Sequence, residues 1–241
     1  MVDCGMKAMG EYLHKIISCL EQIENEERER LDAVSRLVAD TIKNDGLIFT
    51  FGCGHSHLPG LDAFYRAGGL ANVSPMLDTD LMLHNGAAKS SRMEKMSGIA
   101  SEVFRRYVPT EKDMIFIFSA SGKNQVPIEM GDEAKVAKVK SVGVSSSSYF
   151  GRGGRLHEHV DIWLDCKVPY GDACIQVGEA TMGGLSTATA CFILNTCLIE
   201  GAKLALKEGV KPPVYLSGNV DGGREHNVVL ENMYLGRVKH L

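Results

Sequence analysis

The sequence predicts an α/β protein: a largely parallel β-sheet covered by helices on both faces, preceded by a helical N-terminal extension. Two observations predict this fold. Short apolar segments recur along the chain, and most of them lead into a longer segment whose apolar residues have helical spacing. Strands that alternate with helices of this length are joined by crossover connections, and these make neighbouring strands parallel.

Composition narrows the class of protein. The chain has 241 residues, of which 44% are hydrophobic and 23% charged, so it can bury a sizeable core and wholesale disorder is excluded. Its formal net charge of −4 does not favour a broad surface for nucleic acid or for an anionic membrane. We expect one domain over residues 1–241, with a helical extension at 1–45, an α/β core at 46–209 and a C-terminal segment at 210–241.

The individual elements follow from the same periodicity. In the extension, the charged segment Glu24–Arg30 is either a solvated helix face or a break between two helices, and Asn44-Asp45-Gly46 ends the extension with turn residues. Apolar segments predict strands at Leu47–Phe51, Val73–Leu77, Met114–Phe118, Ser141–Val144 and Val160–Leu164. Helical spacing predicts helices at Leu58–Ala67, Ser91–Tyr107, Gln125–Lys138, Leu185–Lys207 and Arg224–Leu241.

Cysteine usage and hydropathy indicate the compartment. The seven cysteines are scattered and include no Cys-x-x-Cys pair, which argues against a disulfide framework or a zinc ribbon. Met1–Gly10 lacks the apolar core of a secretory signal. The apolar stretch Ala188–Ile199 is interrupted by polar residues and is too short to span a membrane. We therefore expect a cytoplasmic protein with no membrane partner and no nucleic-acid partner.

Glycine and serine cluster directly after three of the predicted strands, where ligands bind in open α/β sheets. After the first strand comes Gly52–His57, in which Gly54, His55 and Ser56 precede a predicted helix. Glycines let backbone N–H groups approach an anion, and a helix N-terminus attracts one. The Ser56 hydroxyl can donate a hydrogen bond to a phosphate oxygen.

The second cluster, Ser119–Asn124, follows the third predicted strand. Its hydroxyls at Ser119 and Ser121 and its Gly122 repeat the chemistry of the first loop, and Asn124 is a suitable helix N-cap. A third hydroxyl-rich turn, Ser145–Ser148, follows the fourth predicted strand. Three such turns at successive strand ends predict a site for a small anionic ligand.

These two loops resemble those of the SIS (sugar isomerase) domain family of phosphosugar binders and isomerases, through Gly-x-Gly-x-Ser at Gly52–Ser56 and Ser-x-Ser-Gly at Ser119–Gly122. The resemblance extends over roughly Lys43–Gly209, although the family usually has Thr in place of Asn124. Four further stretches resemble an uncharacterised cytoplasmic branch of that family: Gly54–His57, Tyr65–Leu70, Pro169–Ala173 and Asn219–Gly222.

The resemblance implies a three-layer αβα sandwich of the SIS type, flavodoxin- or Rossmann-like, with a five-stranded parallel sheet. It also implies a homodimer or homotetramer whose phosphosugar site lies near a subunit interface. The phosphate-gripping hydroxyls would be Ser56, Ser119 and Ser121, and an amide at Asn124 can also bond a phosphate.

Moving a carbonyl between C1 and C2 of a sugar phosphate needs a base and a second acid or base. Glu94 resembles a recurrent acid of the same branch and is the candidate base; His57 directly follows the phosphate serine and titrates near neutrality. Asp62 is either a third site acid or a salt-bridge partner, and Arg66 contacts either the phosphate or Asp62. No metal or other cofactor is expected, because no third ligand stands beside His55-x-His57 or His157-x-His159.

The sequence therefore predicts a phosphosugar isomerase that acts by proton transfer. Two alternatives remain open at this stage. Relatives of the branch tend to have two adjacent acids where this chain has Leu61-Asp62, which raises the possibility of a non-catalytic phosphosugar sensor. Lyase or etherase chemistry also begins with proton abstraction.

Overall fold

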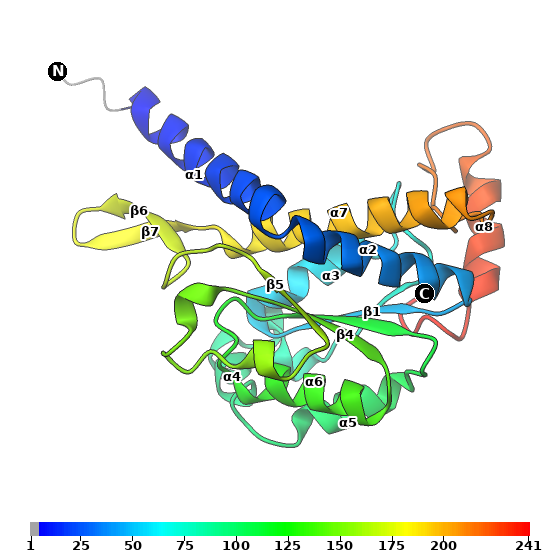
Figure 1. Cartoon of the computed structure of the whole chain (residues 1–241), viewed down its shortest axis with the longest axis horizontal. Helices are drawn as coiled ribbons and strands as arrows, with labels where there is room; N and C mark the ends of the chain where they lie inside the picture. Colours follow the sequence, from blue (N-terminus) through cyan, green and yellow to red (C-terminus); the bar gives the residue numbers. More distant parts are fainter. Residues whose placement is uncertain (1–4) are drawn as a thin grey trace.

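The computed structural model describes residues 5–241, with side chains from residue 10 onward, and has the expected α/β architecture (Figure 1). Five parallel strands form one sheet: β1 (Ile48–Gly52), β2 (Val73–Pro75), β3 (Met114–Phe118), β4 (Lys140–Ser145) and β5 (Ile162–Asp165). Their order in the sheet is β2-β1-β3-β4-β5. The predicted five-stranded parallel sheet is therefore confirmed.

Helices cover both faces of this sheet. The α-helices are α1 (Gly5–Glu26), α2 (Arg28–Lys43), α3 (Leu58–Ala63), α4 (Ala87–Met93), α5 (Ile99–Tyr107), α6 (Gln125–Val136), α7 (Ser186–Lys207) and α8 (Gly223–Tyr234). Layers formed by α2 with α7 and by α5 with α6 lie on opposite faces (Figure 1). The helices of the N-terminal extension thus include α2, which is part of a covering layer.

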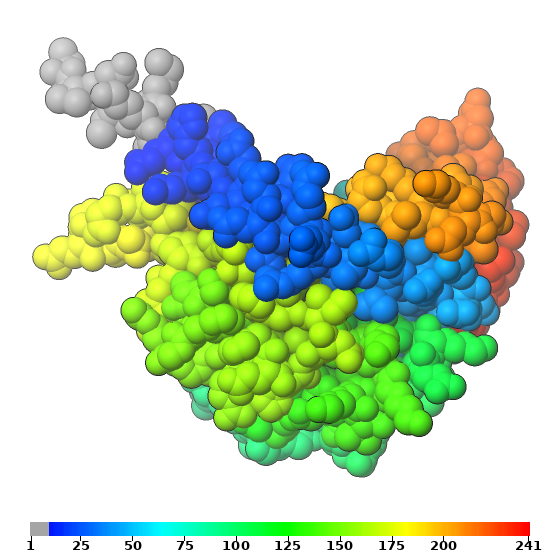
Figure 2. All heavy atoms as spheres, viewed as in Figure 1, coloured from blue at the N-terminus to red at the C-terminus, as the bar shows by residue number. Residues whose placement is uncertain are grey.

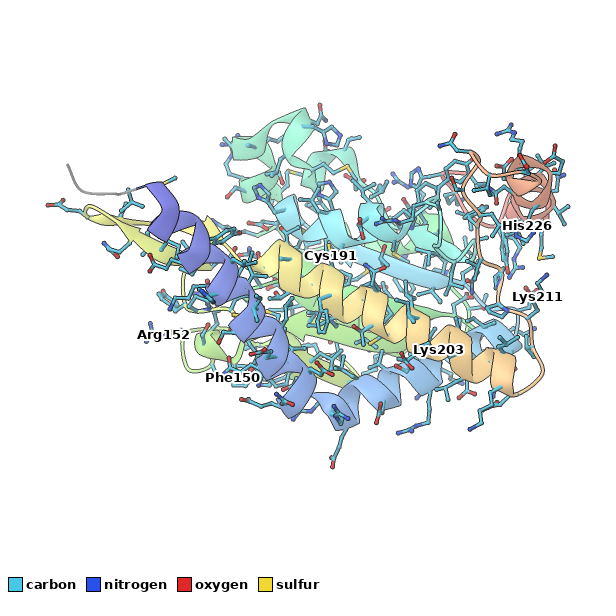
Figure 3. The ribbon with its side chains drawn as sticks, turned by 90° about the horizontal axis from the view of Figure 1, so that it is seen from above. Phe150, Arg152, Cys191, Lys203, Lys211 and His226 are labelled. Atoms are coloured by element: carbon cyan, nitrogen blue, oxygen red, sulfur yellow. The ribbon has the colours of Figure 1, made fainter. Side chains whose placement is uncertain are left out.

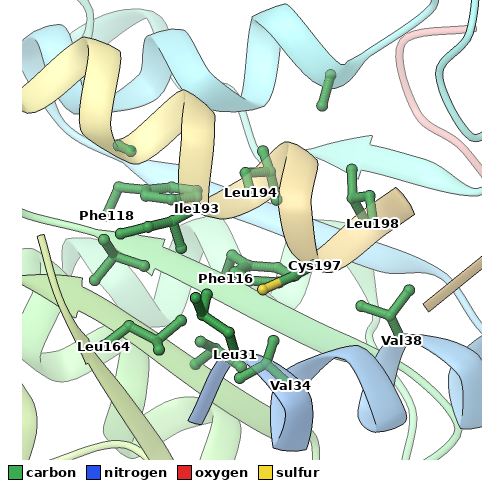
Figure 4. Close-up of a cluster of buried hydrophobic side chains, with 14 of the residues drawn as sticks. Leu31, Val34, Val38, Phe116, Phe118, Leu164, Ile193, Leu194, Cys197 and Leu198 are labelled. Atoms are coloured by element: carbon green, nitrogen blue, oxygen red, sulfur yellow. The ribbon is translucent and has the colours of Figure 1, made fainter. Parts of the chain in front are cut away.

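The core consists of two apolar clusters, one on each face of the sheet. In β3 the side chains alternate: Phe116 and Phe118 pack into the cluster under α2 and α7, whereas Ile115 and Ile117 pack into the cluster under α5 and α6. Figure 4 shows the first cluster, in which Phe116 lies between residues of α2 and α7. Successive strand residues point to opposite faces, so a fully apolar segment such as Met114–Phe118 fills both clusters.

The charged segment Glu24–Arg30 is a break between two helices, because α1 ends at Glu26 and α2 begins at Arg28. Glu27, at the break, is only 2% exposed. Its carboxylate pairs with Lys167 at 3.0 Å and with Arg30 at 2.6 Å. A buried carboxylate needs such partners, and these contacts tie the break to the end of β5.

Several predicted boundaries were wrong for local reasons. The expected helix Ser91–Tyr107 is two helices, separated at Gly98 in the left-handed region with φ 86°. The helix after β1 ends at Ala63 instead of Ala67, and α8 ends at Tyr234 instead of Leu241. The antiparallel hairpin of β6 (Ala173–Val177) and β7 (Ala180–Gly184) was not predicted at all.

The hairpin and α1 project together from one end of the molecule (Figures 1 and 2). The hydroxyl of Tyr12 on α1 donates to the carbonyl of Gly184 on β7 at 2.8 Å. The carboxyl ends of the sheet strands face this same end, because Phe118 at the end of β3 lies beside Ser186 at the start of α7, which follows the hairpin.

Among the described residues, α7 is the one helix that is long and apolar enough to cross a membrane by length and composition. Of its most apolar stretch, 44% is buried within the protein. Ile193, Leu194 and Cys197 on its inner side pack into the core (Figure 4). Core packing therefore accounts for much of its apolar character.

Candidate functional site

The order of the strands alone indicates where a ligand site should lie in this sheet. The chain goes from β1 outward to β2 on one side and to β3, β4 and β5 on the other. At such a reversal, the loops after the two central strands diverge and leave a crevice at their carboxyl ends. The loops after β1 and β3 are the two that carry the glycine–serine motifs.

The loop after β1 folds tightly back on its strand. A Cβ atom on Gly52 would lie 2.1 Å from the carbonyl oxygen of Ser56, so only glycine fits there. A short 3₁₀-helix, Gly54–His57, follows and leads into α3. It leaves Ser56 half-buried and His55 exposed at the strand end.

The loop after β3 holds Ser119 nearly buried, at 7% exposure. The Ser119 hydroxyl accepts a hydrogen bond from the N–H of Gly122 at 3.2 Å. The Ser121 hydroxyl accepts from the N–H of Lys123 at 3.4 Å. Both hydroxyl protons therefore remain free to donate to an acceptor such as a phosphate oxygen.

Asn124 occupies the N-cap position of α6, but its side chain does not cap the helix. The amide instead hydrogen-bonds to the carboxylate of Glu94. The first turn of α6 is also tied to that residue, because the N–H of Val126 donates to the Glu94 carbonyl at 3.1 Å. The prediction of a side-chain cap at Asn124 was wrong, since Glu94 competes for the amide.

The third hydroxyl-rich turn has a largely internal role. The Ser145 hydroxyl accepts from the indole N–H of Trp163 at 2.8 Å, and the Ser146 hydroxyl donates to the carbonyl of Val168 at 2.6 Å. The N–H of Ser147 donates to the Asp165 carboxylate at 3.1 Å. These contacts fix the end of β4 against β5.

One narrow pocket brings the first two loops together. It is lined by His55 and Ser56 from the first loop and by Ser119 from the second. It spans about 270 Å³ up to open solvent, but only about 10 Å³ of it admits the centre of a water molecule. That space suits about one water-sized group, such as a single oxygen of an oxyanion.

Two further pocket residues, Ser186 and Thr187, come from the N-terminus of α7 and were not predicted. Asp172 anchors this helix end: its carboxylate accepts from the N–H groups of Leu185 and Ser186 at 3.0 and 2.8 Å, and from the Ser186 hydroxyl at 2.7 Å. The signal that was overlooked is the serine–threonine pair at the start of a long helix.

Glu94 lies at the end of α4 and is half-buried. Burial raises the pKa of its carboxyl group above the ordinary value of 4.5, and the hydrogen bond from Asn124 and the charge of Lys95 act in the opposite direction. Its carboxylate also acts electrostatically on Cys53 in the first loop. Glu94 thus lies between the corners that follow β1 and β3, and a carboxyl group with a raised pKa suits a general base.

His57 is buried beneath the first loop, with 7% exposure. Its Nδ1 contacts the carbonyl oxygen of Gly54, so Nδ1 carries the proton and Nε2 is the acceptor. Burial lowers the pKa of the imidazole, and the neighbouring His84 and His55 lower it further. The ring of His84 stands edge-on to that of His57, 6.3 Å away, so three imidazoles gather at this corner.

Asp62 has internal partners. Its carboxylate pairs with Arg66 one turn further along and accepts from the side-chain amide of Asn195 on α7 at 3.2 Å. Neither Asp62 nor Arg66 lines the pocket, and Glu94 and His57 also lie outside its lining. Of the two alternatives that the sequence left open for Asp62, the structure shows the salt bridge.

Other potential metal ligands are dispersed. Within residues 5–241, no group of three His, Cys, Asp or Glu side chains is placed to hold a metal ion. Burial raises the pKa of the Cys53 thiol far above its ordinary value, which keeps this sulfur protonated. His159 hydrogen-bonds to Asp132 at 2.8 Å, away from His55 and His57.

Comparisons with known proteins show the family of the chain. The SIS domain model matches residues 11–146, from α1 to the loop after β4. A UPF0309 protein of Thermoanaerobacter pseudethanolicus is 38% identical over 96% of this chain and 99% of its own length. Another, from Caldanaerobacter subterraneus, is 37% identical over 95% and 98%. The chain therefore belongs to the SIS domain family and, within it, to the UPF0309 proteins.

Solved structures support the same fold. The phosphoheptose isomerase of Neisseria gonorrhoeae is similar with a TM-score of 0.55 and 16% identity, over 80% of this chain and 97% of that one. A protein of Escherichia coli CFT073, solved as a complex, is similar with a TM-score of 0.53 and 10% identity, over 88% and 95%. At these identities the likeness concerns the fold.

Proposed function

We propose that this protein binds a phosphorylated sugar and interconverts its aldose and ketose forms by proton transfer. The observation that carries the proposal is the meeting of Ser56 and Ser119 in one pocket at the β1/β3 crevice, with Glu94 at the same corners. The hydroxyls and the glycine-loop amides would hold the phosphate. Membership of a family that includes phosphosugar isomerases supports this substrate class.

Glu94 is the proposed base. Its carboxylate would take the proton from C2 of the open-chain aldose and return it to C1, while a proton passes from O2 to O1 through the enediol. A raised pKa brings a carboxylate closer to the operating pH and makes this transfer more effective. The base is thus supplied by α4, and the adjoining amide of Asn124 orients it.

His57 is the proposed partner for ring opening. Its Nε2 is left as a proton acceptor because Nδ1 is held by the Gly54 carbonyl, and its lowered pKa keeps the ring neutral. Asp62, which is paired with Arg66 and Asn195, holds α3 against α7 in this proposal. Glu94 and His57 are the reacting groups.

Deuterium exchange tests the reaction directly. Sugar phosphates that raise the melting temperature would be incubated with the protein in D₂O, and NMR would follow deuterium at C1 and C2. We expect exchange with wild type and a loss of about 10² to 10⁴-fold in Glu94→Gln. The matched control is Glu102→Gln on α5, whose exposed side chain pairs with Arg105 at the surface. If Glu94→Gln exchanged deuterium as fast as wild type, Glu94 would not be the base.

The same experiment separates the two other functions. The sensor alternative is favoured by the internal pairing of Asp62, which leaves the first loop without a free acid. It predicts a rise in melting temperature with no exchange by wild type. Lyase or etherase chemistry predicts exchange accompanied by a product of different composition.

The proposal includes a cytoplasmic homodimer or homotetramer. The outer side of α7 exposes Ile199 and Leu206, at 52% and 59%, and α1 exposes Leu13 at 55%. Large apolar side chains on one helical layer are typical of a surface that is covered on assembly. Sedimentation equilibrium would show the assembly, and Ile199→Glu is expected to weaken it; a monomeric wild type would contradict it.

A further inference from the structure

Two positively charged side chains, called the rim pair below, belong to the loops after β3 and β4, whose strand ends line the pocket through Ser119 and Val144; they have no role in the mechanism above. Lys123 belongs to the loop after β3, two residues beyond Ser121, and Arg152 belongs to the loop after β4. Within residues 5–241, neither forms an ion pair, whereas Arg155 on the same loop pairs with Glu158 at 3.5 Å. Figure 3 shows Arg152 at the end of the molecule from which the hairpin projects.

The two loops are packed against each other. The side chain of Lys123 covers Gly153: its Cε lies 3.2 Å from the position that a Cβ would take there. Gly154 is equally close to the other loop, since a Cβ on it would lie 2.7 Å from the Ser121 carbonyl oxygen. The carbonyl of Gly122 accepts from the N–H of Arg155 at 2.8 Å. Lys123 and Arg152 therefore flank the same short stretch of the phosphate loop.

Arg152 is held in place by aromatic rings. Its guanidinium lies over the ring of Tyr170, 4.3 Å from the centroid, and Tyr170 packs against Tyr149 at 4.9 Å. The Tyr149 hydroxyl accepts from the N–H of Gly171 at 3.0 Å. Stacking uses the face of the guanidinium and leaves its N–H groups directed outward in the plane. A positioned arginine of this kind recognises the oxygens of carboxylates and phosphates.

The stacking partner lies next to an anchored turn, and the residue itself is 55% exposed. Tyr170 lies two residues before Asp172, whose carboxylate takes three hydrogen bonds at the start of α7. Because α7 also lines the phosphate pocket through Ser186 and Thr187, the pocket and Arg152 are tied to the same helix end.

We propose that Lys123 and Arg152 bind a second acidic group of the sugar phosphate. The preferred ligand then carries two anionic groups, a phosphoryl group held by Ser56 and Ser119 and a carboxylate or a second phosphate at the rim pair. This inference rests on the proposed function, because it defines the substrate class of the same site. A sugar phosphate whose only acidic group is its phosphate binds there more weakly.

Matched ligand pairs test the inference by calorimetry. Fructose 1,6-bisphosphate would be compared with fructose 6-phosphate, and 6-phosphogluconate with glucitol 6-phosphate, so that each pair differs chiefly in one acidic group. In at least one pair, we expect the member with two acidic groups to bind about tenfold more tightly than the member with one. A difference in the first ligand pair alone identifies a phosphate at the rim pair, and one in the second ligand pair alone identifies a carboxylate.

Substitutions test which residues cause the tighter binding of the ligand with two acidic groups; this difference in affinity is called the advantage. In Arg152→Gln and Lys123→Gln the advantage should fall severalfold, and Tyr170→Leu should reduce it while the charge of Arg152 is kept. Arg155→Gln removes the same charge from the same loop and should leave the advantage unchanged, because Arg155 is paired with Glu158. Melting temperatures of the unliganded variants confirm that each is folded.

The possible failures are distinguishable. If wild type binds both members of each pair with equal affinity, or if Arg155→Gln lowers the advantage as much as Arg152→Gln does, the rim-pair assignment is overturned and the proposed function stands. If none of the four compounds binds wild type, the proposed function and the rim-pair assignment both fail.

Discussion

The two ends of the sheet differ in how their polar groups are used. At the amino end, the loops before β1 and β3 and the turn after α8 surround a hollow in which about 420 Å³ admits the centre of a water molecule. At the carboxyl end the corresponding space is about 10 Å³. Size alone would place the site at the amino end, where Figure 3 shows Lys211 and His226, far from Arg152.

The hydrogen bonds at the two ends favour the carboxyl end as the site, because the polar groups of the amino-end hollow already have partners within the protein. In the larger hollow, the Asp113 carboxylate accepts from the N–H of Leu47 at 2.6 Å and from the N–H and hydroxyl of Thr110 at 2.6 and 2.9 Å. Arg237 pairs there with Asp45 at 2.9 Å. In the smaller pocket, the hydroxyls of Ser56 and Ser119 keep their capacity to bond a ligand. Free polar groups at a strand-end crevice indicate function better than volume does.

The largest effect is expected from Asp113→Ala at the amino end. The change leaves the N–H groups of Leu47 and Thr110 without partners beside the strands, and should lower the free energy of unfolding by about 2–4 kcal/mol. Urea denaturation measures this, and Asp113→Asn should cost less because its amide oxygen still accepts. Phosphosugar binding by the folded fraction should persist; its loss would show that the two ends are coupled.

At the carboxyl end, Ser56→Ala and Ser119→Ala should weaken ligand binding and leave stability almost unchanged. Each removes one donor to the phosphate and should weaken phosphosugar binding about tenfold, while the free energy of unfolding changes by less than about 1 kcal/mol. Calorimetry and urea denaturation on the same samples measure both quantities. Ser147→Ala, in the third turn, is the matched control and should leave the affinity unchanged.

The pH dependence of turnover should reveal Glu94. Its folded-state pKa is raised by burial, so the carboxylate needed for proton abstraction forms only above the ordinary value of 4.5. The acid limb should lie above that pH, and Asn124→Ala should move it higher, because the Asn124 amide lowers the pKa of Glu94. A limb that Asn124→Ala leaves in place would contradict the contact.

The raised pKa of Glu94 also predicts how its contribution to the free energy of unfolding changes with pH. A raised folded-state pKa means that the contribution of Glu94 to folding is fully present below its unfolded value and is lost as the pH rises through the folded value. Glu94→Gln should therefore be slightly more stable than wild type at neutral pH and equal to it, or less stable, in acid.

The smallest effect is expected for Lys112→Gln. Lys112 lines the large amino-end hollow, and its side chain is exposed. The substitution should change the free energy of unfolding by no more than about 0.5 kcal/mol and leave phosphosugar affinity unchanged. A marked loss of affinity would mean that the amino-end hollow also binds the ligand.

The limits of an element were predicted well where all of its residues are apolar and buried. Met114–Phe118 is apolar throughout and buried on both faces, so its limits were predicted correctly. The β6–β7 hairpin was missed because it projects from the core, and its apolar residues Val177 and Met182 are 51% and 60% exposed instead of buried. The order of the strands in the sheet depends on packing between distant segments and has no local signal.

At the site, the sequence identified which loops matter but not the partners of each side chain. Ser56 and Ser119 do meet in one pocket. Ser145 and Asn124 looked equally available, yet Trp163 and Glu94, which are distant in sequence, engage them. The break at Glu27 likewise depends on Lys167, 140 residues further along the chain. Such competition between partners is decided only by the folded structure.

The enclosed thiol of Cys53 has a consequence for the redox behaviour of the protein. Disulfide exchange and peroxide oxidation proceed through the thiolate, and this sulfur is both 6% exposed and held in its protonated form. We therefore expect oxidants to leave the Cys53 thiol unmodified in the folded protein. Alkylating reagents at neutral pH will spare this cysteine until the chain unfolds, which makes its labelling a sensitive report of global opening.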